Sequence, residues 1–115
     1  MRELKFKGYK NGLVWYSENY ESIGLFFTDM ERIKANIMQY IGRKDKDGKG
    51  KEIYHKDLII NKSRNGGKPH LVEWSDKSGA WVGVYKGLEY LIAEELHEIE
   101  VVGNFIENPE LVKYA

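Results

Sequence analysis

The 115-residue chain contains no cysteine, only two prolines and no long apolar run. Without cysteine there is no disulfide, no thiol nucleophile and no thiolate ligand for zinc, so a reducing cytoplasm is the expected compartment. No apolar stretch approaches the about 18–20 residues that cross a membrane, and the first twelve residues have no apolar core of signal-peptide length. The sequence therefore predicts a soluble cytoplasmic protein that does not enter a membrane.

The composition is that of a globular protein. Hydrophobic residues make up 42% of the chain and charged residues 31%, a balance that separates folded domains from disordered segments. A chain of this length is expected to form a single domain, residues 1–115, with a hydrophobic core of its own.

The charges cancel, 18 against 18, but they are unevenly placed. Residues 41–70 hold nine Lys or Arg and four Asp or Glu, whereas residues 89–110 hold seven glutamates and no Lys or Arg. One interpretation is a basic face for nucleic acid. The residues that would form it are Lys44, Lys62, Arg64 and Lys68. The other interpretation is that the two segments pack side by side and neutralise each other.

Strand patterns dominate. Residues 4–7 alternate apolar and charged, and Asn11-Gly12 is a hairpin turn signal followed by the apolar run 13–16. Residues 71–75 and 80–85 predict a second hairpin around a polar turn. Further strands are expected at 23–27, 52–60 and 98–102, with a loop at 61–69.

Helical signals are fewer. Thr28 and Glu31 have capping-box spacing, which predicts a short helix over 29–40. Residues 88–97 fit either a short helix or a strand, and Asn108-Pro109 predicts a terminal helical turn. The expected fold is therefore mostly β, a β-rich α+β domain of antiparallel hairpins with one or two short helices.

Residues 45–52 begin like a calcium-binding EF-hand loop, with Asp45, Asp47 and Gly50 at positions 1, 3 and 6. Positions 5 and 12, however, hold Lys49 and Lys56, where oxygen ligands belong. We therefore interpret the segment as a glycine-rich turn and expect no calcium there.

Three segments carry a stronger signal. They are QYIGRKDKDGKGKEIY (39–54) followed by Asp57, the opening MRELKFKG (1–8) and the closing EVVGNFIENPEL (100–111). In this order they resemble the YopX family, small proteins encoded by phages and prophages, whose central motif runs roughly QYTGLKDKNGKEIYEGDI. The chain departs from this motif at Ile41, in a two-residue insertion at Lys49-Gly50, and at His55-Lys56, where the family has Glu-Gly.

The resemblance implies a mostly β fold and a phage or prophage origin, and it brings no catalytic residue and no cofactor. The family-motif positions are expected to be structural. They are Gln39, Tyr40, Gly42, Asp45, Gly48, Glu52, Ile53, Tyr54, Asp57, Gly103, Asn104, Glu107, Asn108 and Pro109.

Few residues could carry chemistry. On one strand His55 and Asp57 would share a face, as an acid/base pair or half a metal site. His70 and His97 are expected to be exposed, and neither a serine elbow nor a phosphate-binding loop is present. Trp74 and Trp81 flank one turn and would face each other, either as core or as a stacking platform for nucleic acid.

These observations favour a non-enzymatic accessory module that binds a host or phage protein in the bacterial cytoplasm. Nucleic-acid binding through segment 43–68 is the alternative, and a small hydrolase or metal-dependent enzyme using His55 and Asp57 is a third. Exposed strand edges, common in such folds, also predict a homo-oligomer.

Overall fold

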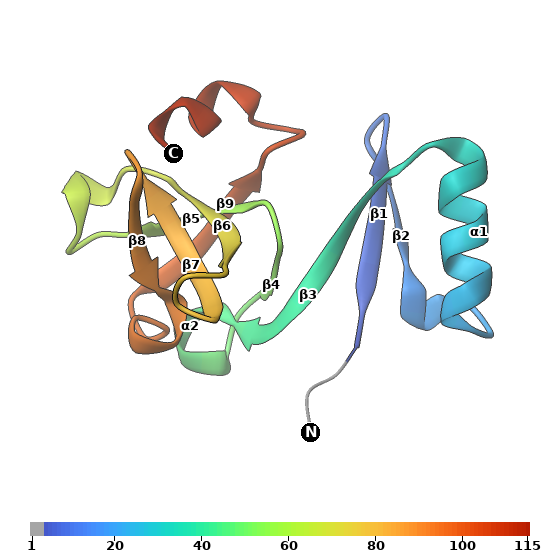
Figure 1. The fold of residues 1–115 in the computed structure, drawn as a ribbon, viewed down its shortest axis with the longest axis horizontal. Helices are drawn as coiled ribbons and strands as arrows, with labels where there is room; N and C mark the ends of the chain where they lie inside the picture. The colour runs from blue at the N-terminus through green and yellow to red at the C-terminus, as the bar shows by residue number, and fades with distance from the viewer. Residues whose placement is uncertain (1–3) are drawn as a thin grey trace. The chain divides into compact units, whose positions relative to one another are not determined.

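The computed structural model describes residues 4–115, with only the backbone of residues 47 and 48 (Figure 1). Strands dominate and pair antiparallel, which confirms the predicted β-rich fold. Internal contacts divide the chain into two compact units, residues 1–40 and 41–115, which are described separately below. That the whole chain folds as one domain stays a prediction.

The first unit is built on a hairpin. Strands β1 (Phe6–Lys10) and β2 (Leu13–Tyr16) are joined by Asn11 and Gly12, whose φ angles of 51° and 79° are those of a type I′ turn. Strand β3 (Asn36–Lys44) pairs with the other side of β1. The hairpin expected from Asn11-Gly12 is confirmed.

Helix α1 (Ile23–Ile33) corrects two predictions. The Ser22 side chain accepts a hydrogen bond from Leu25 N at 3.2 Å and begins the helix, so residues 23–27 are not a strand. The helix ends at Lys34, whose left-handed φ of 58° turns the chain into β3, so most of 29–40 is not helical. Short apolar runs do not distinguish helix from strand by periodicity alone, which explains the error.

Helix α1 packs on one face of the β1–β2 hairpin. The rings of Phe6 and Phe27 meet edge to face with centroids 4.9 Å apart. A Cβ atom on Gly8 would lie 2.1 Å from the sulfur of the fully buried Met30. Only a glycine at position 8 therefore lets the helix approach this closely without moving Met30.

The second unit follows the middle of β3. Its elements are α2 (Asp45–Gly48), β4 (Glu52–Tyr54), β5 (Asp57–Asn61), η2 (Asn65–Gly67), β6 (His70–Ser75), β7 (Ala80–Tyr85), β8 (Leu88–Leu91), η3 (Ile92–Glu94), β9 (Ile99–Asn104) and η4 (Pro109–Tyr114). Five of them form an antiparallel sheet in the order β8-β7-β6-β5-β9, and β4 pairs with β3 (Figure 1).

Most of the sequence-predicted strands of this unit are found. The β6–β7 hairpin has the expected bounds within one residue and places Trp74 directly opposite Trp81. The predicted strand 52–60 is two strands, because His55 and Lys56 form a turn with a φ of 73° at Lys56. Residues 88–97 form β8 and the short 3₁₀ helix η3, which settles the helix–strand alternative mainly for the strand.

The core of the second unit is built from buried residues of β3, β4, β5, β6, η3 and β9. Its buried aliphatic residues are Ile41, Ile53, Ile59, Val72, Ile92 and Ile99, with Trp81, Leu96 and Val101 packed against them. Within the described residues no helix is long and apolar enough to span a membrane.

Candidate functional site

Asp45 organises the turn that resembled a calcium loop. Its side chain is fully buried, and its two oxygens accept hydrogen bonds from Lys51 N at 2.6 Å and Val101 N at 2.8 Å. A Cβ atom on Gly50 would lie 1.9 Å from Asp45 Oδ1. The inserted Lys49-Gly50 pair thus supplies the glycine that lets the chain close over this carboxylate, which binds backbone amides.

The second part of the motif surrounds the turn between β4 and β5. Asp57 is buried, and its carboxylate accepts a hydrogen bond from Tyr54 N at 2.8 Å. The hydroxyl of Tyr54 donates to Glu52 at 3.1 Å, and Ile53 is fully buried in the core. These side chains hold the turn and anchor it to the interior.

The third part of the motif is a capped turn after β9. Asn104 Oδ1 accepts hydrogen bonds from the backbone N–H of Ile106 and of Glu107, both at 2.9 Å, and Asn104 Nδ2 donates to Glu107 Oε1 at 2.8 Å. Asn108 Oδ1 accepts from Asn104 N at 3.3 Å, and a Cβ atom on Gly103 would lie 2.1 Å from that oxygen. Pro109 opens η4, as the sequence predicts for the helical turn.

The remaining motif positions lie on β3 and α2. Gln39 pairs with Phe6 of β1, and Tyr40 is buried, with the Lys5 ammonium 4.8 Å from its ring centroid. Gly42 has a φ of 85°, and Gly48 ends α2.

The basic and acidic segments neutralise each other at several points. Strand β5 pairs with β9, and Arg64 Nε lies 2.5 Å from Glu95 Oε1, while Lys46 Nζ lies 3.4 Å from Glu100 Oε2. The guanidinium of Arg64 also stacks on Tyr90 at 4.4 Å. Side-by-side packing of the two segments is thus confirmed. The Arg64 side chain is held by its contacts with Glu95 and Tyr90.

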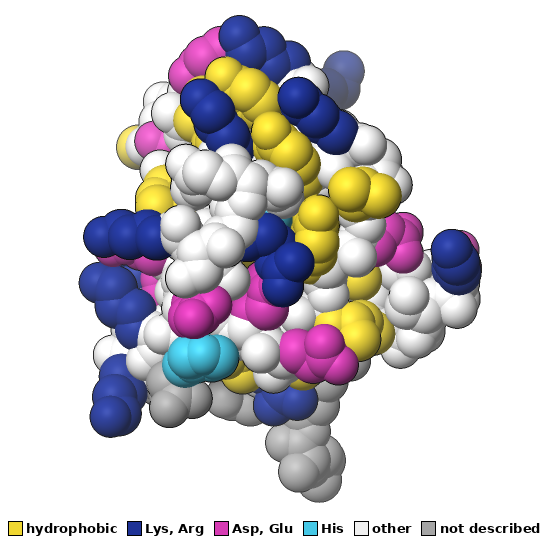
Figure 2. Space-filling view, turned by 90° about the vertical axis from the view of Figure 1, so that its left-hand side faces the viewer, with side chains coloured by type: hydrophobic (Ala, Val, Ile, Leu, Met, Phe, Trp, Pro, Cys, Tyr) yellow, Lys and Arg dark blue, Asp and Glu magenta, His cyan; other side chains and the backbone are white. Residues whose placement is uncertain are grey.

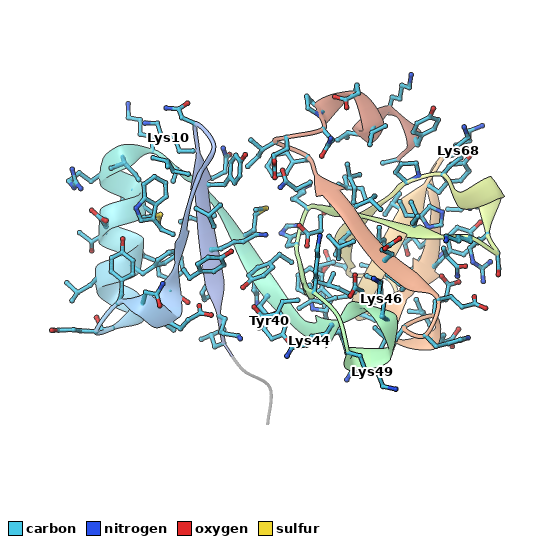
Figure 3. The ribbon with its side chains drawn as sticks, turned by 180° about the vertical axis from the view of Figure 1, so that it is seen from behind. Lys10, Tyr40, Lys44, Lys46, Lys49 and Lys68 are labelled. Carbon is cyan, nitrogen blue, oxygen red and sulfur yellow. The ribbon has the colours of Figure 1, made fainter. Side chains whose placement is uncertain are left out.

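The other three candidates for nucleic-acid contact are exposed, but they belong to two places: Lys62 and Lys68 flank η2, and Lys44 ends β3. Lys44 lies beside α2 with Lys46 and Lys49, whereas Lys68 lies at a distance from them in the same unit (Figure 3). Lys62 belongs to the exposed segment before η2. Figure 2 shows Lys and Arg side chains interspersed with Asp and Glu on the face it presents, with no continuous basic area.

His55 is paired with the carboxylate of Glu73. Because residues 55 and 56 form a turn, the expected shared strand face of His55 and Asp57 is wrong. His55 Nε2 lies 3.0 Å from Glu73 Oε2, and Lys56 Nζ donates to Glu73 Oε1. Burial alone would raise the pKa of Glu73, but these two hydrogen bonds outweigh it and lower the pKa.

Trp74 and Trp81 border this group. Their rings meet edge to face with centroids 5.4 Å apart, and His55 lies 5.4 Å from Trp81. Trp74 is 44% exposed and donates from Nε1 to Asp76 at 3.0 Å. Trp81 Nε1 is buried and has no acceptor among the described residues. We call Trp74, Trp81, His55, Lys56 and Glu73 the tryptophan cluster.

The tryptophan cluster combines features of a recognition surface. Trp74 is more exposed than its size and apolarity favour, and it lies beside ionisable side chains that remain about one-third exposed. Sequence reasoning missed Glu73, because nothing in its local pattern indicates a partner 18 residues away.

The two other histidines differ from each other. His97 is exposed as expected, but His70 is 2% exposed, which corrects the prediction for it. Asn65 Nδ2 lies 3.2 Å from His70 Nε2, and the rings of Tyr85 and Tyr90 each lie 5.3 Å away. Burial lowers the pKa of His70 below its ordinary value, so the ring is neutral at pH 7.

Among the side chains that the structure describes, no group of three or more His, Asp or Glu is arranged to hold a metal ion. The candidate site consists of aromatic and ionisable side chains on the β6–β7 hairpin and on the neighbouring β4–β5 turn. Such a surface can bind another molecule through apolar burial and charge-assisted hydrogen bonds.

Comparison with known proteins shows that this chain is similar to solved structures. Protein EF1440 from Enterococcus faecalis superposes with a TM-score of 0.51 at 24% identity, over 96% of this chain and 75% of that one. No curated protein matches. The family model described as YopX protein matches residues 2–113, nearly the whole sequence. The chain therefore belongs to the YopX family.

Proposed function

We propose that this protein is a non-enzymatic protein-binding module, and that the tryptophan cluster is its contact surface. The observation that carries the proposal is the 44% exposure of Trp74 on a hairpin strand. Tryptophan is enriched among the residues that dominate binding energy at protein interfaces. The partner is a host or phage protein in the cytoplasm of a bacterium that carries the phage or prophage.

The contacts that hold Trp74 within the fold support the same function. Trp74 is paired with Trp81 across an antiparallel hairpin, and its indole N–H is held by Asp76. A side chain already fixed in position loses little conformational entropy when a partner covers it. The nearby His55 and Lys56 offer hydrogen-bond donors at the margin of the apolar contact.

The test compares two exposed apolar positions of the second unit. Trp74→Ser removes the central side chain, and Leu88→Ser is the matched control, because Leu88 is 58% exposed on β8. Tagged wild-type and variant proteins are used to capture proteins from bacterial lysate, with and without nuclease, after thermal unfolding has shown that each is folded.

A protein retained by the wild type and by Leu88→Ser, but lost with Trp74→Ser, would support the proposal. Equal retention by all three proteins would remove the tryptophan cluster as the contact surface. Retention that disappears with nuclease would favour nucleic acid as the partner.

Nucleic-acid binding is the second candidate, and the exposure of Lys62 and Lys68 around η2 favours it. Neither lysine forms an ion pair with a described acidic side chain, although the Lys68 ammonium lies 5.6 Å from the centroid of the Tyr114 ring. Their charges are therefore not neutralised by a described carboxylate. The double variant Lys62→Ala/Lys68→Ala should weaken binding to a labelled oligonucleotide and lower the slope of log affinity against log salt by about 2. Binding that is absent at low salt, or unchanged in the variant, would contradict this function.

A further inference from the structure

Strand β2 forms one end of its sheet and has an unpaired edge. In the order β2-β1-β3-β4 it has a neighbour on one side only. Because Lys10 and Leu13 flank a two-residue turn, they form a hydrogen-bonded pair, and the pairs alternate along the hairpin. Leu13 and Trp15 thus bond to β1, while the backbone N–H and C=O of Val14 and Tyr16 point away from the sheet.

The bond from Phe6 supports this assignment. Phe6 N donates to Ser17 Oγ at 3.0 Å, so the backbone N–H of Phe6 points toward β2. The alternation of hydrogen-bonded pairs requires this direction for the even-numbered residues of β1. No backbone partner for Val14 or Tyr16 on the outer edge is found among residues 4–115. The edge therefore offers two donors and two acceptors in register.

The side chains of this edge are apolar and exposed. Leu13 is 60% exposed, Val14 38% and Tyr16 39%. Natural proteins commonly protect edge strands with charged side chains, proline or bulges, and residues 13–16 contain none of these. An unprotected apolar edge is therefore suited to pairing with a strand of another chain.

The charges at the two ends of β2 have opposite signs. Lys10 and Lys34 lie at the hairpin end, where the Lys10 ammonium donates to Ile33 O. The other end leads into Glu18 and Glu21, both exposed. Lys5 Nζ lies 3.9 Å from Glu18 Oε2 and offsets part of this charge, while residues 11–31 contain no Lys or Arg. An antiparallel second copy would place the acidic end of one strand beside the basic end of the other.

We propose that β2 pairs antiparallel with β2 of a second copy of this chain, about a two-fold axis at Trp15. Val14 and Tyr16 of each copy then exchange hydrogen bonds with Tyr16 and Val14 of the other, which gives four in total. The two Trp15 side chains meet as a non-hydrogen-bonded cross-strand pair, the closer kind. The contact is isologous, so it closes as a dimer and forms no fibre.

The first experiment measures molar mass by light scattering as a function of concentration. The wild type should approach twice the monomer mass over about 10–500 µM. Val14→Pro removes an outward N–H and leaves the β1–β2 bonds intact, so this variant should remain monomeric. A wild type that is monomeric throughout, or a dimer unaffected by Val14→Pro, would overturn the proposal.

A pair of charge variants tests the register of the proposed β2–β2 contact without a proline substitution. Val14→Glu/Tyr16→Glu places like charges opposite each other across the two-fold axis, whereas Val14→Lys/Tyr16→Glu places opposite charges there. The two variants differ only at position 14, and both put a glutamate beside Lys7 of β1. Their dissociation constants should differ by about tenfold, and salt should narrow the difference.

Thermal unfolding of each variant shows whether the monomer remains folded. Equal dissociation constants for the two charge variants, in both about 50 mM and about 500 mM salt, would overturn the antiparallel register. Because β2 belongs to the first unit and the tryptophan cluster to the second, loss of dimerisation can be separated from loss of partner capture.

Discussion

At the scale of single residues, the family-motif side chains of the second unit mostly bind backbone. Asp45, Asp57 and Asn104 are all at least 95% buried, and each accepts hydrogen bonds from main-chain N–H groups. A buried acceptor of this kind is costly to remove, because its donors then lose their partners without gaining water. Substitutions at these three positions are therefore expected to act mainly by lowering the stability of the fold.

Asp45 and Gly50 should depend on each other. Asp45→Ala leaves the N–H groups of Lys51 and Val101 without their acceptor, and it should lower the free energy of unfolding by about 2–4 kcal/mol. Gly50→Ala should also destabilise, because the added Cβ meets Asp45 Oδ1 at 1.9 Å. Urea denaturation measures both effects.

The control for the glycine is Gly24, which lies in α1 with its nearest atom 3.8 Å from a built Cβ. Gly24→Ala should raise stability by up to about 1 kcal/mol through helix propensity. A Gly50→Ala variant as stable as the wild type would show that the turn closes differently.

His70 should make stability depend on pH. Its folded-state pKa is lowered by burial, so below pH 6.5 the unfolded chain binds a proton that the folded chain excludes. The free energy of unfolding should therefore fall on acidification from pH 6.5, by at most about 1.4 kcal/mol per pH unit from this group.

In His70→Gln this part of the pH dependence should disappear, because glutamine keeps an acceptor for Asn65 and does not titrate. His97→Gln is the control, since the His97 side chain is 64% exposed. Parallel pH profiles for the wild type and His70→Gln, measured by denaturation between pH 5 and 7, would contradict the assignment.

At the scale of elements, α1 is the part that sequence patterns assigned least well. The sequence predicted that Thr28 caps the helix, whereas in the structure the cap is Ser22, six residues earlier. In the structure Thr28 lies within the helix, and its hydroxyl donates to Gly24 O. The choice between the caps follows from packing, because a start at Ile23 buries Phe26 and Met30.

Substitution of the two caps separates these alternatives. Ser22→Ala should destabilise the protein by about 1 kcal/mol, because Leu25 N loses its acceptor. Thr28→Ala should be neutral or slightly stabilising, since alanine has the higher helix propensity inside a helix. Chemical denaturation monitored by circular dichroism gives both values, and the reverse order would place the helix start at Thr28.

At the scale of the whole molecule, the question is whether the two contact units unfold together. Strand β3 runs from residue 36 to residue 44 and crosses the boundary between Tyr40 and Ile41 without interruption. We expect one cooperative transition, as the single-domain prediction requires.

Tryptophan fluorescence can report the unfolding of each unit separately. Trp15 lies in the first, and Trp74 and Trp81 lie in the second. Trp74→Phe/Trp81→Phe leaves Trp15 as the only tryptophan, and Trp15→Phe is the matched variant. For each variant, the midpoint of unfolding measured by fluorescence is compared with the midpoint measured by circular dichroism. Agreement of the two midpoints in both variants would support one domain, and a difference between them would contradict it.

The sequence alone determined the features whose causes lie within a few residues. Asn11-Gly12 predicted the first hairpin because both residues accept positive φ, and the alternation around residues 76–79 predicted the second, including the facing of Trp74 and Trp81. The family resemblance and the β-rich class followed from patterns of this kind spread over the whole chain.

Only the tertiary structure decided the features that depend on distant neighbours. His70 is buried because Tyr85 and Tyr90 cover it, and His55 meets Glu73 because the β4–β5 turn runs beside β6. Arg64 could not be separated from Lys62 and Lys68 by sequence, since its partner Glu95 lies 31 positions along the chain. Contacts of this range carry no local signal, because packing of whole strands creates them.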